Sequence, residues 1–262
     1  MRTRFLQRGW TRFRPNPAIS AWIEAAGPIA DAVLRDPEMD QWYRYGRTWF
    51  VGVNALPNDT HGAIGQGPSL QGPPVDFIRS HLGAEAVHWD RGQLSVCFPG
   101  YPQPSPDEPS ESYRYRVNRD AAHVDGLHRM GPERRRILRE PHAFVFGIPL
   151  VTVDSGMSPL VVWEGSHEIM RSTFAAALAG VAPQHWANIN LASSYVAARR
   201  RVFETCKRVE ITTQIGESYL IHRLAVHGMA PWATASGQHR NGRQIVYFRP
   251  LLPTVEDWLR MP

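Results

Sequence analysis

The order of apolar and polar residues predicts helices in the first part of the chain and many short strands in the second. Runs rich in Val, Ile, Phe and Tyr, several bounded by Gly or Pro, predict strands at 48–53, 94–98, 113–117, 143–151, 160–163, 209–214, 218–221 and 244–248. Helical periodicity predicts helices at 17–35, 75–82, 132–139, 168–178 and 193–205. This order is typical of a β-sandwich or barrel with helices packed outside it.

Two Gly- and Pro-rich segments, 54–74 and 99–112, predict long loops before the later strands. Loops of this length in a compact domain are usually lids or binding loops. We therefore expect residues 1–262 to form a single domain. Residues 1–112 would be a helical and loop elaboration over the barrel mouth, and 113–250 the core that carries the site.

The cysteines and the N-terminal segment indicate the cellular compartment. Cys97 and Cys206 lie far apart with no CxxC pattern, which argues against a disulfide framework or a thiolate zinc site. The basic segment 1–13 is followed by no apolar stretch typical of a signal peptide, and no segment approaches a membrane span. We expect a cytoplasmic protein without a membrane partner.

The chain has a formal charge of +5 and a sequence pI of about 9.5. Its densest basic runs, 134–136 and 199–201, are not interleaved with aromatic residues as in a stacking platform for nucleic acid. We expect both runs to be solvated helix faces and predict no nucleic-acid partner. The excess charge would favour an anionic small-molecule substrate. The sequence leaves the oligomeric state open.

Two His-x-Asp motifs occur, at 88–90 and 123–125. Residues i and i+2 of a strand share a face, so one imidazole and one carboxylate can reach the same ion. The motif with His123 and Asp125 is favoured because it follows a strand-like run and is directly followed by Gly126. Enough strands also come after it to complete a barrel. The motif at 88–90 is interpreted as a surface turn with Trp89 in the core.

A third ligand is expected from a late strand, where His222 and His227 are five residues apart. A straight strand would point them to opposite faces. His227 is favoured because Gly228 permits close backbone approach, whereas His222 is interpreted as a hydrogen-bonded core histidine. Two histidines and one carboxylate form the facial triad of non-haem iron(II) oxygenases, which leaves coordination positions open.

The segments HVDG (123–126), SPLVVWEGSHE (158–168), HG (227–228) and GRQIVYF (242–248) together resemble the phytanoyl-CoA dioxygenase family. The resemblance covers about residues 113–250. It implies a mainly β fold with flanking helices, built on a double-stranded β-helix (jelly-roll, cupin-like) core. It also implies a dioxygenase that uses Fe(II), 2-oxoglutarate and dioxygen. His123, Asp125 and His227 would then be the metal ligands.

In that resemblance Arg243 matches the arginine that binds the distal carboxylate of 2-oxoglutarate, and the loop residue Arg240 is its rival. The family's small hydroxyl residue two positions after the distal histidine is Met229 here, so another donor, a water or a rearranged pocket must serve. The presence of Asp125 favours hydroxylation or another oxidation over halogenation, because related halogenases have a small residue at that position.

Basic residues flank the triad motif and are candidates for binding an anionic substrate. Arg114, Arg116 and Arg119 precede it, and His128 and Arg129 follow it. We take Arg116 and His128 as the candidate substrate residues. Two other functions remain open. One is a jelly-roll metalloenzyme that catalyses hydrolysis or isomerisation. The other is a relative that binds a ligand without turnover.

Overall fold

The computed structural model describes residues 1–82, 88–106, 108–233 and 241–261. Its strands are β1 (Trp10–Phe13), β2 (Tyr43–Arg44), β3 (Trp49–Gly52), β4 (Gln93–Cys97), β5 (Leu127–Met130), β6 (Arg135–Leu138), β7 (Phe144–Pro149), β8 (Leu160–Trp163), β9 (Arg208–Ile211), β10 (Ser218–His222), β11 (His227–Met229) and β12 (Arg243–Phe248). Its helices are α1 (Arg2–Arg8), α2 (Pro17–Arg35), α3 (Pro73–His81), α4 (Ser110–Arg119), α5 (Ser166–Ala177), α6 (Ala192–Thr205) and α7 (Asp257–Arg260), with 3₁₀ turns at Pro37–Trp42 and Pro183–Asn188.

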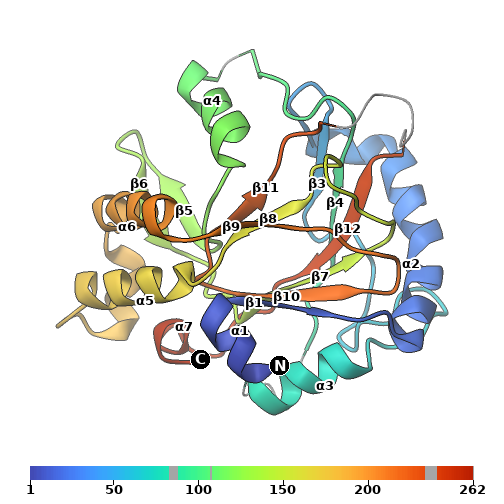
Figure 1. Ribbon diagram of the computed structural model, residues 1–262, viewed down its shortest axis with the longest axis horizontal. Helices are drawn as coiled ribbons and strands as arrows, with labels where there is room; N and C mark the ends of the chain where they lie inside the picture. The colour runs from blue at the N-terminus through green and yellow to red at the C-terminus, as the bar shows by residue number, and fades with distance from the viewer. Residues whose placement is uncertain (83–87, 107, 234–240, 262) are drawn as a thin grey trace.

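The strands form two facing antiparallel sheets (Figure 1). The larger sheet has the order β1-β10-β7-β12-β4-β3-β2 and the smaller one the order β11-β8-β9, while β5 and β6 pair as a separate hairpin. A mainly antiparallel β fold with flanking helices, built on a jelly-roll core, confirms the expected fold class.

Alternation along the strands divides the apolar residues into three layers. In β8, Leu160 and Val162 lie in the cluster between the sheets, whereas Val161 and Trp163 lie in the cluster that faces α5 and α6. In β12, Val246 and Phe248 pack against α2 and α3 on the outer face of the larger sheet. The inner face of the larger sheet is therefore free to line a site.

Two predicted elements have the wrong type. Residues 113–117 belong to α4, where Tyr115 and Arg119 both contact Phe203 of α6, as residues four apart on a helix can. Residues 132–139, predicted as a helix, are a turn followed by β6, which pairs with β5. Positive φ angles at Gly131 and Arg134 close this hairpin.

The larger sheet contains strands from both sides of the predicted boundary at residue 112. It takes β1, β2, β3 and β4 from the N-terminal part, and β4 pairs directly with β12. The division of the chain into an N-terminal elaboration and a core stays a prediction. Strands from both parts nevertheless build the wall of the site.

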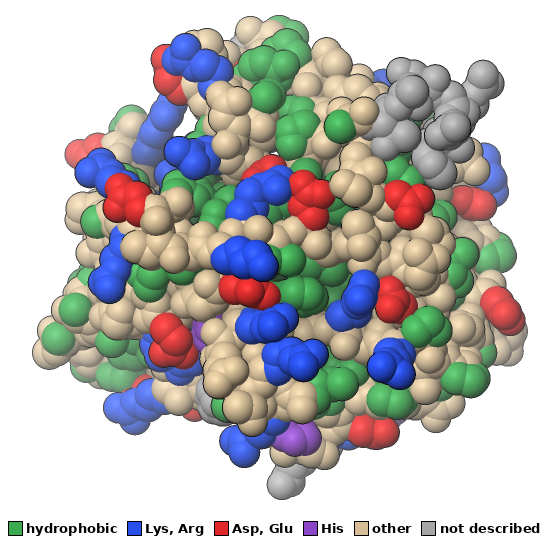
Figure 2. Space-filling model, in the orientation of Figure 1, with side chains coloured by type: hydrophobic (Ala, Val, Ile, Leu, Met, Phe, Trp, Pro, Cys, Tyr) green, Lys and Arg blue, Asp and Glu red, His purple; other side chains and the backbone are tan. Residues whose placement is uncertain are grey.

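The surface and the helices bear on possible partners. On the face shown in Figure 2, Lys and Arg side chains are interspersed with acidic and apolar ones. Within the described ranges, no helix combines the length and the apolar character that crossing a membrane requires. The expected absence of a nucleic-acid partner and the cytoplasmic location stay predictions.

Candidate metal centre and its two chambers

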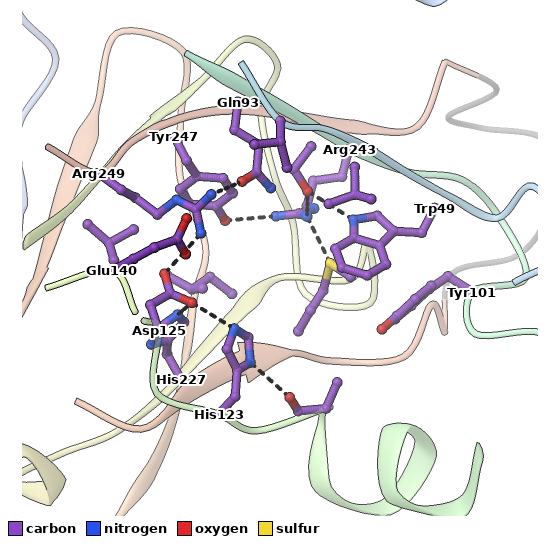
Figure 3. Close-up of a pocket in the computed structure, with 18 of the residues that line it drawn as sticks. Trp49, Gln93, Tyr101, His123, Asp125, Glu140, His227, Arg243, Tyr247 and Arg249 are labelled. Atoms are coloured by element: carbon purple, nitrogen blue, oxygen red, sulfur yellow. Dashed lines mark hydrogen bonds and ion pairs between the residues drawn. The ribbon is translucent and has the colours of Figure 1, made fainter. Parts of the chain in front are cut away.

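His123, Asp125 and His227 converge on one point (Figure 3). Asp125 Oδ1 lies 3.1 Å from His123 Nε2 and 3.8 Å from His227 Nε2. One ligand atom from each of the three residues can be chosen so that all lie within 4.8 Å of one another. Two imidazole nitrogens and one carboxylate oxygen form a donor set that suits iron(II).

Backbone pairing between distant segments sets this geometry. His123 N donates to His227 O at 2.8 Å, and His227 N donates to His123 O at 3.0 Å. Gly126 and Gly228 allow the chain to pack this closely. A Cβ on Gly228 would lie 2.1 Å from the carbonyl oxygen of Asp120, and a Cβ on Gly126 would lie 2.1 Å from the carbonyl oxygen of Glu140. The close approach expected at Gly228 is thus present.

Each histidine presents Nε2 to the centre because its Nδ1 is engaged elsewhere. His123 Nδ1 lies 3.0 Å from the carbonyl oxygen of Ala121, and His227 Nδ1 lies 2.9 Å from that of Ala225. When the imidazole is neutral, a proton on Nδ1 donated to these carbonyls leaves Nε2 as a lone-pair donor; when His123 is protonated, its Nε2 donates to Asp125 instead. Burial lowers the pKa of His227 to about 4, so this imidazole is neutral at neutral pH.

The carboxylate ligand is held from a second side. Burial disfavours the charge of Asp125, but the hydrogen bond from His123 and the charge of Arg249 hold its pKa well below the usual range. Arg249 Nη1 lies 3.4 Å from Asp125 Oδ2, and Arg249 Nη2 donates to Gln93 Oε1. Because Arg249 binds Oδ2, Asp125 Oδ1 is directed toward the two imidazoles.

An inner chamber of about 380 Å³ extends from the triad between the sheets. Arg243 lies at the end opposite the triad in Figure 3 and is only 1% exposed. Among the described residues Arg243 has no carboxylate partner, and its buried Nε has no hydrogen-bond partner. A buried guanidinium without a counter-charge is costly, and a carboxylate ligand would satisfy it.

A hydroxyl group from another strand lies beside Met229 and Arg243. Arg243 Nη2 lies 2.8 Å from Met229 Sδ and 3.3 Å from the hydroxyl of Ser95 on β4. Ser95 Oγ also accepts a hydrogen bond from Trp49 Nε1 at 3.1 Å, and the phenol of Tyr247 lies 3.4 Å from Arg243 Nη1. Hydroxyl groups are therefore present beside Arg243, although none comes from position 229.

An outer chamber of about 770 Å³ adjoins the inner one at the triad. His123 and Asp125 line both chambers, as do Trp49, Ala121, His128, Glu140 and Arg249. The triad thus lies where the space between the sheets meets a larger space lined by α4, α6 and the β5–β6 hairpin.

The structure places Arg116 and His128 in the outer chamber, each beside an acid. Arg116 is buried, pairs with Glu108 and lies over the ring of Tyr45, with 3.7 Å from Cζ to the centroid. His128 Nε2 lies 2.8 Å from Glu140 Oε2. Their roles in substrate binding stay predictions.

The expectation that both arginine runs are solvated helix faces is wrong. Arg136 on β6 and Arg199 on α6 line the outer chamber. Only the second run is helical, because the first lies in the hairpin turn and β6. In each run the remaining two arginines are absent from the lining of both chambers.

Other sequence candidates lie away from the centre. Trp89 is buried in the core, as expected, and Asp90 accepts the backbone N–H of Arg249 at 2.9 Å. His222 is buried and contacts Arg171 Nη2 at 2.9 Å, which confirms its interpretation as a hydrogen-bonded core histidine. Arg240 lies outside the described residues.

Sequence reasoning missed four lining residues that strand alternation could have found. Ser95 and Gln93 share the inner face of β4, and Tyr247 shares that of β12 with Arg243. Arg249 continues the same i+2 series just beyond β12. The signal was the spacing of polar residues in strands whose other face is apolar.

No family model and no curated protein sequence matches the chain. Among solved structures, it is similar to AviO1 from Streptomyces viridochromogenes Tue57, with 16% identity, coverage of 96% of this chain and 93% of that chain, and a TM-score of 0.44. It is also similar to SnoK, a non-haem α-ketoglutarate-dependent carbocyclase from nogalamycin biosynthesis, with 14% identity, coverage of 98% and 87%, and a TM-score of 0.49. EctD from S. alaskensis, solved with 2-oxoglutarate and 5-hydroxyectoine, has 13% identity, coverage of 95% and 73%, and a TM-score of 0.43. Similarity at these levels assigns neither substrate nor reaction to this chain.

Proposed function

We propose that this chain is an Fe(II)- and 2-oxoglutarate-dependent oxygenase of the phytanoyl-CoA dioxygenase type that hydroxylates a small, anionic metabolite. The observation that carries the proposal is the pairing of two features across one chamber. A His-Asp-His triad lies at one end, and a buried arginine without an acidic partner among the described residues lies at the other. A hydrolase or isomerase would need the triad but would leave Arg243 without a ligand.

The residues present fit both groups. His123, Asp125 and His227 would hold iron(II), and Arg243 would bind the distal carboxylate of 2-oxoglutarate in a charge-assisted contact. The chemistry supplied by iron(II), 2-oxoglutarate and dioxygen together is oxidation of a substrate carbon, coupled to decarboxylation of the cosubstrate to succinate.

The chain's own residues bind, orient and exclude water. Arg249 orients Asp125, and the backbone carbonyls of Ala121 and Ala225 orient the two imidazoles. Trp49, Tyr101 and Val145 line the inner chamber and limit water around the cosubstrate. The substrate would enter from the outer chamber, which adjoins the triad.

The test is an anaerobic titration of the metal-free protein with Fe(II) and 2-oxoglutarate, followed by the visible charge-transfer band of chelated cosubstrate. We expect the band in the wild type and in the exposed-surface control Arg200→Gln. Arg243→Met and Asp125→Ala should lose it. Iron-loaded wild-type protein without a band would overturn the proposal and favour the hydrolytic or non-catalytic alternative. Release of succinate under dioxygen separates the oxygenase from both alternatives.

A further inference from the structure

The outer chamber contains three guanidinium groups that no acidic side chain in the described part of the chain neutralises. Arg129 on β5, Arg136 on β6 and Arg199 on α6 all line it. Among the described residues, none of the three takes part in an ion pair. Arg129 and Arg136 are directly paired across the hairpin, and Arg136 and Arg199 both contact the ring of Tyr195, so the fold brings the three groups to one wall.

Two of these arginines are held in place by aromatic rings. Arg136 Cζ lies 5.3 Å and Arg199 Cζ 5.0 Å from the ring centroid of Tyr195, and Arg199 Cζ lies 4.6 Å from that of Tyr115. Arg136 Nη1 also donates to the carbonyl oxygen of Leu127 at 3.1 Å. Such contacts fix the direction of a guanidinium but leave its positive charge uncompensated.

The three groups repel one another. Burial lowers the pKa of Arg136, and the charges of Arg129 and Arg199 lower it further. The cost of bringing like charges together is recovered when an anion binds between them.

The other charges in this chamber are already paired. Arg116 pairs with Glu108, Arg249 with Asp125, and Glu140 with His128. Glu111, at the rim, pairs with Arg114 outside the chamber. The uncompensated positive charge therefore lies on the wall formed by β5, β6 and α6.

We propose that Arg129, Arg136 and Arg199 bind a phosphate group of the substrate, from which the carbon to be oxidised extends to the triad. A phosphate monoester carries a charge of about −1.5 to −2 at neutral pH and offers three acceptor oxygens, which suits three guanidinium forks. A carboxylate supplies one charge and two oxygens and would leave one arginine unmatched. The inference that the substrate is oxidised at the triad rests on the proposed function, whereas the inference that the three arginines bind a phosphate does not.

The experiment is calorimetric titration of the anaerobic Fe(II)- and 2-oxoglutarate-loaded protein with phenyl phosphate, with one equivalent of 2-oxoglutarate and at two salt concentrations. We expect saturable binding that weakens as salt increases. Arg199→Gln and Arg129→Gln should each weaken it by about tenfold or more, the effect of losing one charge-assisted hydrogen bond. The exposed neighbour of Arg199 on the same helix provides the matched control, Arg200→Gln, which should bind as the wild type does.

Equal affinity in the wild type and all variants would overturn the inference, and so would benzoate binding as tightly as phenyl phosphate. The charge-transfer band of the same samples reports the metal and the cosubstrate separately and shows that the variants are folded. A band without arginine-dependent binding of phenyl phosphate would overturn this inference alone. Arginine-dependent binding without a band would leave the anion site standing and overturn the proposed function.

Discussion

Arg249 lies just beyond β12 and touches the carboxylate that would bind the metal. Its Nη1 is 3.4 Å from Asp125 Oδ2, while Asp125 Oδ1 faces the imidazoles. Groups that orient a metal ligand in this way typically change metal affinity by about 10–100-fold when they are removed. Arg249 is therefore a positioning residue for Asp125.

We expect Arg249→Leu to weaken Fe(II) binding by about 10–100-fold, because Asp125 loses the contact that fixes its rotamer. Anaerobic competition with a coloured chelator measures the affinity. Arg249→Lys should restore part of it, and Arg200→Leu on the exposed face of α6 should leave it unchanged. Unaltered affinity in Arg249→Leu would show that Asp125 is oriented without Arg249.

Cys97 lies beside Arg243 but is not a reactive thiol. Burial raises its pKa to about 11, and the nearby charge of Arg243 opposes this only in part. Since the thiolate is the nucleophile, only about one Cys97 in a thousand is reactive at pH 8, and the fraction grows about tenfold per pH unit up to the pKa.

We therefore expect iodoacetamide at pH 8 to modify the half-buried Cys206 well before the fully buried Cys97. Mass spectrometry of the native protein measures both rates, and the urea-unfolded protein provides the reference in which they converge. If Cys97 reacted as fast as Cys206 in the native state, Cys97 would not be buried beside Arg243 as the structure has it.

At the scale of elements, the short strand β11 can bring His227 to His123 only because its middle residue is Gly228. A Cβ there would lie 2.1 Å from the carbonyl oxygen of Asp120 and 3.1 Å from Ala122 Cα, both backbone atoms. Neither atom can move away as the end of a flexible side chain could.

We expect Gly228→Ala to reduce the free energy of unfolding by about 1–3 kcal/mol and to weaken Fe(II) binding, because the backbone pairing of the triad must open. Urea unfolding and Fe(II) titration measure the two effects. Gly27→Ala in α2 is the control, since a Cβ there meets nothing within 4 Å. Because the ring of the following Pro28 disfavours helical backbone for a residue with a Cβ, the gain in helix propensity is offset, and that change should stay within about 1 kcal/mol of the wild type and leave Fe(II) binding unchanged. Wild-type behaviour of Gly228→Ala would show that the segments are not so closely packed.

Strand alternation explains only part of what was predictable. Arg243 directly adjoins the predicted strand 244–248, but β11, which carries His227, was not among the predicted strands. His123 and Asp125 do meet, yet His123 lies in an isolated bridge to His227 and Asp125 in a turn, so the strand argument for them was wrong. The same rule applied to β4 would have found Ser95. The alternating sequence YRYRV favoured a strand at 113–117. These residues form a helix because one side of it packs against Phe203, a contact that the local sequence does not reveal.

At the scale of the molecule, each chamber is built from segments far apart in the sequence. Ser95, Met229 and Arg243 meet in the inner chamber through the β4–β12 pairing and the facing of the two sheets. The outer chamber joins the β5–β6 hairpin to α6. Strand alternation could place Ser95 on the inner face of β4, but local patterns contain no information on strand pairing, so its position beside Met229 and Arg243 could not be predicted from the sequence.

The buried charge of Arg243 also has a consequence for the stability of the whole fold. The ligand-free protein keeps this guanidinium 1% exposed, without an acidic partner among the described residues and beside the apolar or weakly polar side chains of Cys97 and Met229. Replacing buried charged groups by apolar ones of similar volume often stabilises a protein by about 1–4 kcal/mol. Function and stability are therefore opposed at this position.

We expect Arg243→Met to raise the stability of the ligand-free protein by about 1–4 kcal/mol, measured by urea unfolding. With anaerobic Fe(II) present, 2-oxoglutarate at a hundred times its dissociation constant should stabilise the wild type by about a further 2.7 kcal/mol. It should add nothing to Arg243→Met, because the variant lacks the group that binds the distal carboxylate. A variant less stable than the wild type would show that Arg243 supports the fold itself. A 2-oxoglutarate effect equal in both proteins would show that the cosubstrate binds elsewhere.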